Sequence, residues 1–149
     1  DCVRSITNRT KLKIRSPFAI RPWQHVMEPI SGYIKLSMKL YKNRKKFSSS
    51  WNFGPDLGKT YTVKKVINIF LKELRVNKKI IFRKNTSFNE TITLQLNCKK
   101  SKKFLNWKTV WNTFESIKRT SNWYKVYLEG GNIVEYTNNQ INNYFNKGI

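Results

Sequence analysis

The stretch of sequence that decides the fold is residues 11–33, KLKIRSPFAIRPWQHVMEPISGY. Its first five residues, Lys11–Arg15, alternate polar and apolar side chains, and this alternation predicts a half-buried strand. Pro17 ends the strand. Pro29 stands in a first-turn position and predicts a helix that continues to about Asn43. The stretch therefore predicts a strand and a helix joined by a loop of polar and aromatic residues.

That loop carries Arg21, Trp23, Gln24 and His25, which is the only histidine of the chain. An arginine fork pairs bidentately with phosphate or carboxylate, while the other three side chains offer a stacking face and hydrogen-bonding groups. These residues therefore suggest an anion site. In the alternative, the arginine pairs with an internal carboxylate and the tryptophan fills the core. The loop alone favours neither alternative.

Strands and helices alternate along the rest of the chain, which predicts an α/β or α+β domain. We expect short strands at Trp51–Phe53, Lys79–Arg83 and Ile92–Leu96, and helices at 1–6, Thr62–Arg75, Val110–Leu128 and Thr137–Phe145. A basic helix turn is expected just before Phe104. The Asn-rich residues 132–149 are expected to be loosely held.

The formal net charge of +22 suggests nucleic-acid binding, but the composition weakens that argument. The chain holds 22 Lys against 8 Arg, with 17 Asn, 14 Ile and a single Ala, which indicates a coding bias rather than selection for phosphate contacts. We interpret the basic runs 42–46 and 99–103 as solvated faces. In the rival hypothesis, residues 99–103 bind nucleic acid with Trp107 and Trp111 as stacking faces; their helical spacing favours the core instead.

Several kinds of chemistry have no motif in the sequence. The chain has no Gly-rich dinucleotide or phosphate loop, no paired carboxylates, and too few His and Cys for a zinc site. Two Tyr-x-x-x-Lys matches begin at Tyr41 and Tyr61, but chance alone predicts about one. We therefore expect no catalytic, cofactor-binding or metal-binding residue here. Cys2 and Cys98 lie far apart and no apolar run could span a membrane, so we expect a cytoplasmic protein.

Six segments together resemble the CDP-glucose 4,6-dehydratases, which are extended short-chain dehydrogenases of the epimerase/dehydratase family. The segments are Ile14–Tyr33, Trp51–Asp56, Leu94–Cys98, Leu105–Trp107, Trp123–Tyr124 and Thr137–Ile141. The resemblance implies an α/β fold, the C-terminal substrate-binding portion of such an enzyme, with a strand and helix that complete its dinucleotide-binding domain. Residues 1–149 would form one sugar-nucleotide-binding region.

The resemblance further implies that the NAD-binding loop and the catalytic Tyr-x-x-x-Lys lie upstream of this region. The family oxidises the sugar at C4 with NAD, eliminates water across C5 and C6, and returns the hydride to C6. We therefore expect these residues alone to be inactive and to expose apolar surface. The expected partners are the nucleotide sugar and further copies of the full-length enzyme, not nucleic acid or a membrane.

By this resemblance Arg21 lies near the nucleotide diphosphate. We expect Trp23, Gln24 and His25 to orient it, because the loop continues directly into a helix. Glu90 is a second candidate for a ligand contact, with an ion pair to a nearby lysine as the alternative. Three positions depart from the family pattern. Asn89 replaces a histidine, Gln95 a lysine and Asn97 an aspartate. Each change keeps a hydrogen-bonding group and removes a charge or a titratable site. Neutral drift, altered substrate preference and lost activity all stay open as explanations.

Overall fold

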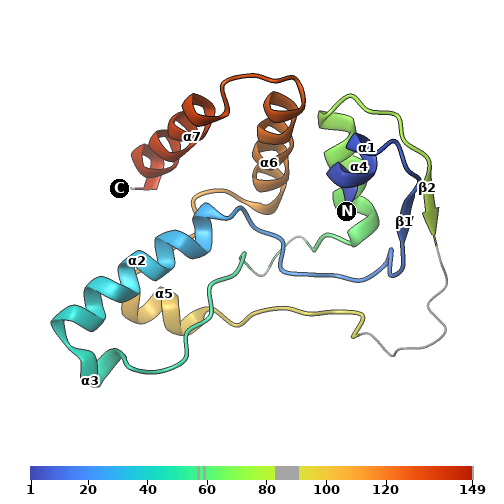
Figure 1. The fold of residues 1–149 in the computed structure, drawn as a ribbon. Coiled ribbons are helices and arrows are strands. Elements are labelled where there is room, and N and C mark those ends of the chain that lie inside the picture. Colours follow the sequence, from blue (N-terminus) through green and yellow to red (C-terminus); the bar gives the residue numbers. More distant parts are fainter. Residues whose placement is uncertain (57, 59, 83–90, 149) are drawn as a thin grey trace.

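The computed structural model describes residues 1–56, 58, 60–82 and 91–148. Figure 1 shows a chain that is mostly helical, with one small sheet. The elements are α1 (Cys2–Thr7), β1 (Leu12–Ile14), α2 (Met27–Lys42), α3 (Arg44–Phe47), α4 (Val63–Glu73), β2 (Ile80–Phe82), α5 (Lys99–Leu105), α6 (Thr113–Leu128) and α7 (Ile133–Gly148). The two strands are parallel, with Leu12 beside Ile80.

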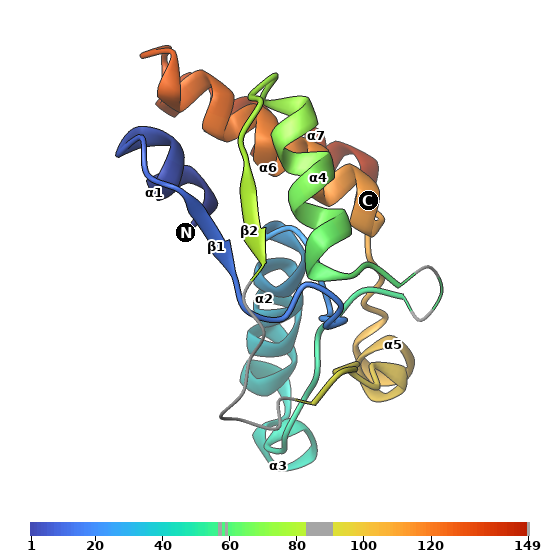
Figure 2. The same ribbon diagram turned by 90° about the vertical axis from the view of Figure 1, so that its right-hand side faces the viewer.

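In Figure 1, α6 lies beside α4, and α7 lies beyond α6, above α2. The strands lie beside α1 and α4 at one end, and α2 leads away to α3 and α5 at the other (Figures 1 and 2). Helix α4 packs against α6, α6 against α7, and α2 against α3 and α5. The loop from β1 to α2 therefore runs through the middle of the molecule, where it can contact several elements.

Two hydrophobic clusters hold this arrangement together. One lies between α2, α3 and α5, and its buried members are Phe47, Phe53, Cys98, Leu105 and Trp107. The other joins the start of α2 to α7, and its buried members are Met27, Trp111 and Tyr144. Burying aromatic rings of this size is the main source of stability for such packing.

Several sequence predictions are confirmed. The first strand and the strand near residue 80 form β1 and β2, and α2 ends at Lys42, one residue before the predicted limit. Helix α4 begins after Thr62, whose hydroxyl accepts the Lys65 amide at 3.2 Å, as expected of an N-cap.

The strands predicted near residues 52 and 94 are wrong. Residues 51–56 form no strand, and the later segment makes only an isolated bridge between Thr93 and Ile20. Side chains replace the strand ladder in the first of these segments. The carbonyl of Asn52 accepts Ser101 Oγ at 2.5 Å, and that of Phe53 accepts Gln24 Nε2 at 2.9 Å.

The predicted loose C-terminus is also wrong, because residues 133–148 form α7. This helix begins four residues before the predicted cap, since Asn132 Oδ1 accepts the Glu135 amide at 3.1 Å. Thr137 lies inside the helix, where its hydroxyl accepts the indole N–H of Trp123 at 2.9 Å. Tyr144 is only 1 % exposed, so the Asn-rich sequence still provides an inward-facing side. Helix α6 likewise begins at residue 113, capped by Asn112, rather than at 110.

Candidate functional site

Arg21 lies at the edge of a cavity in the middle of the molecule. Its Nη1 donates to the carbonyl of Ile20 at 2.9 Å and to that of Thr91 at 3.0 Å, so the guanidinium joins two segments that are distant in sequence. The small cavity beside it is lined by Ile20, Arg21, Pro22, Pro55, Asp56, Gly58, Thr60, Tyr61, Gln95, Leu96 and Thr113.

A larger cavity of about 570 Å³ adjoins the first and shares five lining residues with it, including Asp56, Tyr61 and Thr113. Small-molecule sites in proteins commonly have volumes of about 300 to 1,000 Å³. Arg21 lines the small cavity, which adjoins this larger one of small-molecule size.

Trp23 fixes the loop beside this cavity. Its indole N–H donates to the carbonyl of Tyr61 at 3.1 Å, and its own carbonyl accepts the hydroxyl of Thr113 at 3.1 Å. The loop is thereby attached to the segment before α4 and to the first residue of α6. These contacts give Trp23 an orienting role two residues from Arg21.

His25 does not line the Arg21 cavity and is only 6 % exposed. Its Nδ1 accepts the Met27 amide at 3.3 Å, its side chain also hydrogen-bonds Gln140, and its ring lies edge-on to Trp111 at 4.8 Å. Burial, with a contribution from the Arg119 charge, lowers the pKa of His25 to about 4. The imidazole is therefore neutral at physiological pH and supports the fold.

His25 and Gln24 line a second cavity of about 550 Å³ between the start of α2 and helices α6 and α7. Its walls are mainly apolar and include Trp123 and Ile141. The loop that carries Arg21 and His25 thus lines two cavities. Of these two, the one beside Arg21 has a cationic side chain in its wall.

Glu28 is a central residue that the sequence analysis missed. The side chain is fully buried, and its carboxylate accepts the Val110 amide at 3.1 Å and the Trp111 amide at 2.8 Å. Tyr144 donates a third hydrogen bond at 2.8 Å. Burial raises the pKa of Glu28, while these three donors oppose that rise. The available signal was a lone carboxylate in the first turn of an otherwise uncharged helix start.

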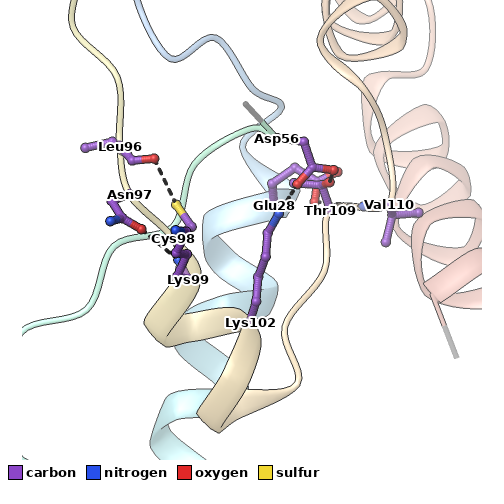
Figure 3. Close-up of polar contacts among 9 residues, drawn as sticks. All are labelled: Glu28, Asp56, Leu96, Asn97, Cys98, Lys99, Lys102, Thr109 and Val110. Carbon is purple, nitrogen blue, oxygen red and sulfur yellow. Dashed lines mark hydrogen bonds and ion pairs between the residues drawn. The ribbon is translucent and has the colours of Figure 1, made fainter. Parts of the chain in front are cut away.

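Asp56 places a carboxylate at the shared edge of the cavities, where it pairs with Lys102 (Figure 3). Thr109 Oγ1 donates to the same carboxylate at 3.0 Å. The hydrogen bond from Lys102 is the main cause of the lowered pKa of Asp56. Because the Lys102 ammonium neutralises this carboxylate, Asp56 does not repel an anion from the Arg21 cavity.

The positions that depart from the family pattern are only partly described. Glu90 and Asn89 lie outside the described residues. Gln95 lines the Arg21 cavity, and Asn97 Oδ1 accepts the Lys99 amide at 3.1 Å at the start of α5. An aspartate could accept the same bond, so the amide at position 97 preserves this local contact.

The two Tyr-x-x-x-Lys matches lie in different surroundings. Tyr61 is buried, and the Lys65 ammonium lies 4.5 Å from its ring centroid, which is a cation–π contact. Tyr41 is 94 % exposed in the last turn of α2. Within the described residues, no three His, Cys, Asp or Glu side chains are grouped as metal ligands, and no helix there is long and apolar enough to cross a membrane.

Comparison with known proteins supports the sequence resemblance. The chain is 33 % identical over 144 residues to the CDP-glucose 4,6-dehydratase of Salmonella typhimurium. The predicted resemblance is confirmed. The aligned region covers 97 % of this chain and 40 % of the Salmonella protein, so the chain spans about two fifths of that relative. No protein-family model matches the chain.

Solved structures show the fold. The dTDP-glucose 4,6-dehydratase of Bacillus anthracis, solved with NAD, matches with a TM-score of 0.63 and 18 % identity, over 83 % of this chain and 37 % of that one. The UDP-glucose 4-epimerase of Thermotoga maritima, solved with UDP-glucose, matches with a TM-score of 0.65 and 15 % identity, over 85 % and 38 %. The chain therefore has the fold of part of an extended short-chain dehydrogenase, as predicted.

Proposed function

We propose that residues 1–149 form the sugar-nucleotide-binding region of an NAD-dependent CDP-glucose 4,6-dehydratase. This lyase would convert CDP-glucose to CDP-4-keto-6-deoxyglucose by oxidation at C4, loss of water and return of the hydride. The observation that carries the proposal is the 33 % identity to the Salmonella enzyme over 97 % of the chain. The position of Arg21 in a small cavity that adjoins a cavity of about 570 Å³ supports it.

In this proposal Arg21 binds the diphosphate of the substrate, because a guanidinium matches phosphate oxygens in charge and geometry. Trp23 holds the backbone next to Arg21, and His25 holds the following turn against α6 and α7. Glu90 stays a predicted second contact. The chain supplies recognition and orientation, while proton and hydride transfer belong to residues outside it.

The residues present do not fit NAD. Dinucleotide sites need a Gly-rich turn after a parallel strand, so that the backbone can approach the pyrophosphate. Neither residues 15–26 after β1 nor residues 83–90 after β2 contain a glycine. We therefore assign NAD binding to another part of the enzyme, and we derive no step through the cofactor here.

An exposed apolar face on α2 supports a further domain in the proposed enzyme. Tyr33, Ile34 and Met38 are 59 %, 46 % and 60 % exposed, although they lie on one side of the helix. Packing against a dinucleotide-binding domain would cover them. As parts of the same proposal, the enzyme is a cytoplasmic homo-oligomer; the two free thiols, Cys2 and Cys98, are consistent with a reducing compartment.

The test is to incubate the complete polypeptide that contains these residues with NAD and CDP-glucose. The expected result is the loss of one water from CDP-glucose, which mass spectrometry detects. dTDP-glucose and UDP-glucose are tested in parallel as comparison substrates. Conversion of one of those two instead would favour a different nucleotide-sugar enzyme. Binding without conversion would identify an inactive homologue, and neither binding nor conversion would overturn the proposal.

The structure argues against the rival nucleic-acid site as formulated from the sequence. Trp107 is 0 % exposed and Trp111 is 3 % exposed, so neither ring can stack on a base. Both belong to the hydrophobic clusters that join α2 to α5 and α7.

A further inference from the structure

The fold brings together two basic runs that lie more than fifty residues apart in sequence. Helices α3 and α5 lie at the same end of the molecule (Figures 1 and 2) and bury Phe47 and Leu105 in the same cluster. The Phe47 and Trp51 rings stack with centroids 6.0 Å apart. Lys46 lies 5.8 Å from the first ring and Lys100 lies 4.4 Å from the second, so cations from both runs flank one aromatic pair.

Positive charge dominates this region. The segment 29–55 has six basic residues and no acidic one, and the segment 91–114 has five basic residues and no acidic one. We call the exposed cations of α3, α5 and the end of α2 the basic end. Its members are Lys39, Lys42, Arg44, Lys45, Lys46, Lys99, Lys100, Lys102 and Lys103. Asp56 borders this surface and is paired with Lys102.

The basic end reaches the candidate site through an intermediate cavity. A space of about 370 Å³ is lined by Pro55, Asp56, Leu96, Asn97, Cys98, Lys99 and Lys102. Three of these residues, Pro55, Asp56 and Leu96, also line the Arg21 cavity. Two lysines of the basic end, Lys99 and Lys102, therefore line a cavity that adjoins the one lined by Arg21.

We propose that the basic end steers the diphosphate of the nucleotide sugar into the Arg21 cavity. The proposal rests on the proposed function and adds the route by which the anionic substrate arrives. Clustered charge of one sign raises the local concentration of an oppositely charged ligand and can increase association rates by about 10- to 1,000-fold. The distal cations act before the ligand makes contact. They therefore change the rate of association and do not change the rate of dissociation.

The experiment compares two charge-matched variants of the complete polypeptide. One carries Lys42→Gln, Arg44→Gln, Lys45→Gln and Lys103→Gln at the basic end. The control carries Lys11→Gln, Lys72→Gln, Lys79→Gln and Lys147→Gln, which are also exposed but lie outside the basic end. Each variant loses four positive charges. Stopped-flow fluorescence with CDP-glucose, at ionic strengths of about 20 and 300 mM, measures both rate constants.

At low salt we expect association about tenfold slower in the basic-end variant, less than threefold slower in the control, and an unchanged dissociation rate in both. At high salt the difference should disappear, because screening acts over about 10 Å or less. Equal slowing in both variants would assign the effect to total charge and overturn the proposal, and so would unchanged association. If the unmodified protein binds no CDP-glucose, the proposed function fails as well. Melting temperatures of both variants check that they are folded.

Discussion

Tyr144 donates its phenolic hydrogen to Glu28 Oε2 at 2.8 Å, which joins α7 to the first turn of α2. The same carboxylate holds the amides of Val110 and Trp111, so one buried side chain connects three segments. Because α2 follows directly from the Arg21 loop, this network also fixes the end of that loop. Burial raises the pKa of Tyr144, which keeps the phenol protonated as a donor.

Glu28→Gln should destabilise the structure although the side-chain shape is retained. The amide group would direct N–H donors toward groups that are themselves donors, and one buried donor would lose its partner. We expect a loss of about 2 kcal/mol in urea unfolding, with faster hydrogen exchange at the Val110 and Trp111 amides. Glu129→Gln is the matched control, since Glu129 is exposed at the end of α6. Equal stability of the two variants would contradict the role of Glu28.

His25 should make stability depend on pH. Its pKa is about 4 in the folded chain and near 6.5 in a free side chain, so the unfolded state binds more protons between these values. Its contribution is therefore complete above pH 6.5 and is lost as the pH falls toward 4. With about 1.4 kcal/mol for each pKa unit and a reduction for solvent screening, we expect about 2 kcal/mol.

The measurement is the unfolding free energy from pH 4 to 7.5 for the unmodified protein and for His25→Gln. Subtracting the two curves removes the carboxylates that titrate in the same range. The difference should change between pH 4 and 6.5 and be flat above. A difference that is constant over the whole range would mean that the buried imidazole does not resist protonation.

Local sequence patterns predicted β1, β2 and α4 well, because alternation, helical spacing and a capping threonine act within a few residues. The segment near Phe53 could not be assigned in this way, since its carbonyl is held by Gln24, 29 positions earlier. Helix α7 was misjudged for a similar reason. Its Asn content suggests a loose end, yet Tyr144 is buried against partners more than a hundred residues away.

The candidate site shows the same division. The Arg21 cluster could be singled out from residue types alone, because guanidinium chemistry is local. The orientation of its neighbours could not, since Trp23 and His25 are each fixed by segments distant in sequence. Glu28 escaped notice because its role exists only after α7 and the loop before α6 have folded around it.

Arg21→Ala should weaken binding of CDP-glucose to the complete polypeptide by at least about 1.5 kcal/mol, or roughly tenfold in Kd. The arginine also links two backbone segments, so the melting temperature must be measured in parallel. Arg15→Ala is the control, because it removes the same charge from an exposed position near the loop. Isothermal titration calorimetry gives the affinities. Unchanged affinity would remove Arg21 from the substrate site.

Gly32→Ala tests the packing of α2 on the segment that leads to Asp56. A Cβ at position 32 would lie 2.3 Å from Phe53 Cδ1, well inside van der Waals contact. The Phe53 ring cannot move aside easily, because it is buried and lies edge-on to Tyr33 and Trp107. Relieving such a clash in a packed core costs about 1 to 3 kcal/mol.

Gly58→Ala is the control, since a Cβ there meets nothing within 4 Å. We expect the Gly32 variant to melt several degrees lower and the Gly58 variant to melt at or near the temperature of the unmodified protein. The shift of Phe53 would also disturb its carbonyl, which accepts the Gln24 amide. Binding of CDP-glucose should therefore weaken in the Gly32 variant even below its melting temperature. If that variant keeps full stability and affinity, then the Phe53 ring has room to move away from a Cβ at position 32, and the packing of α2 on Phe53 is not tight.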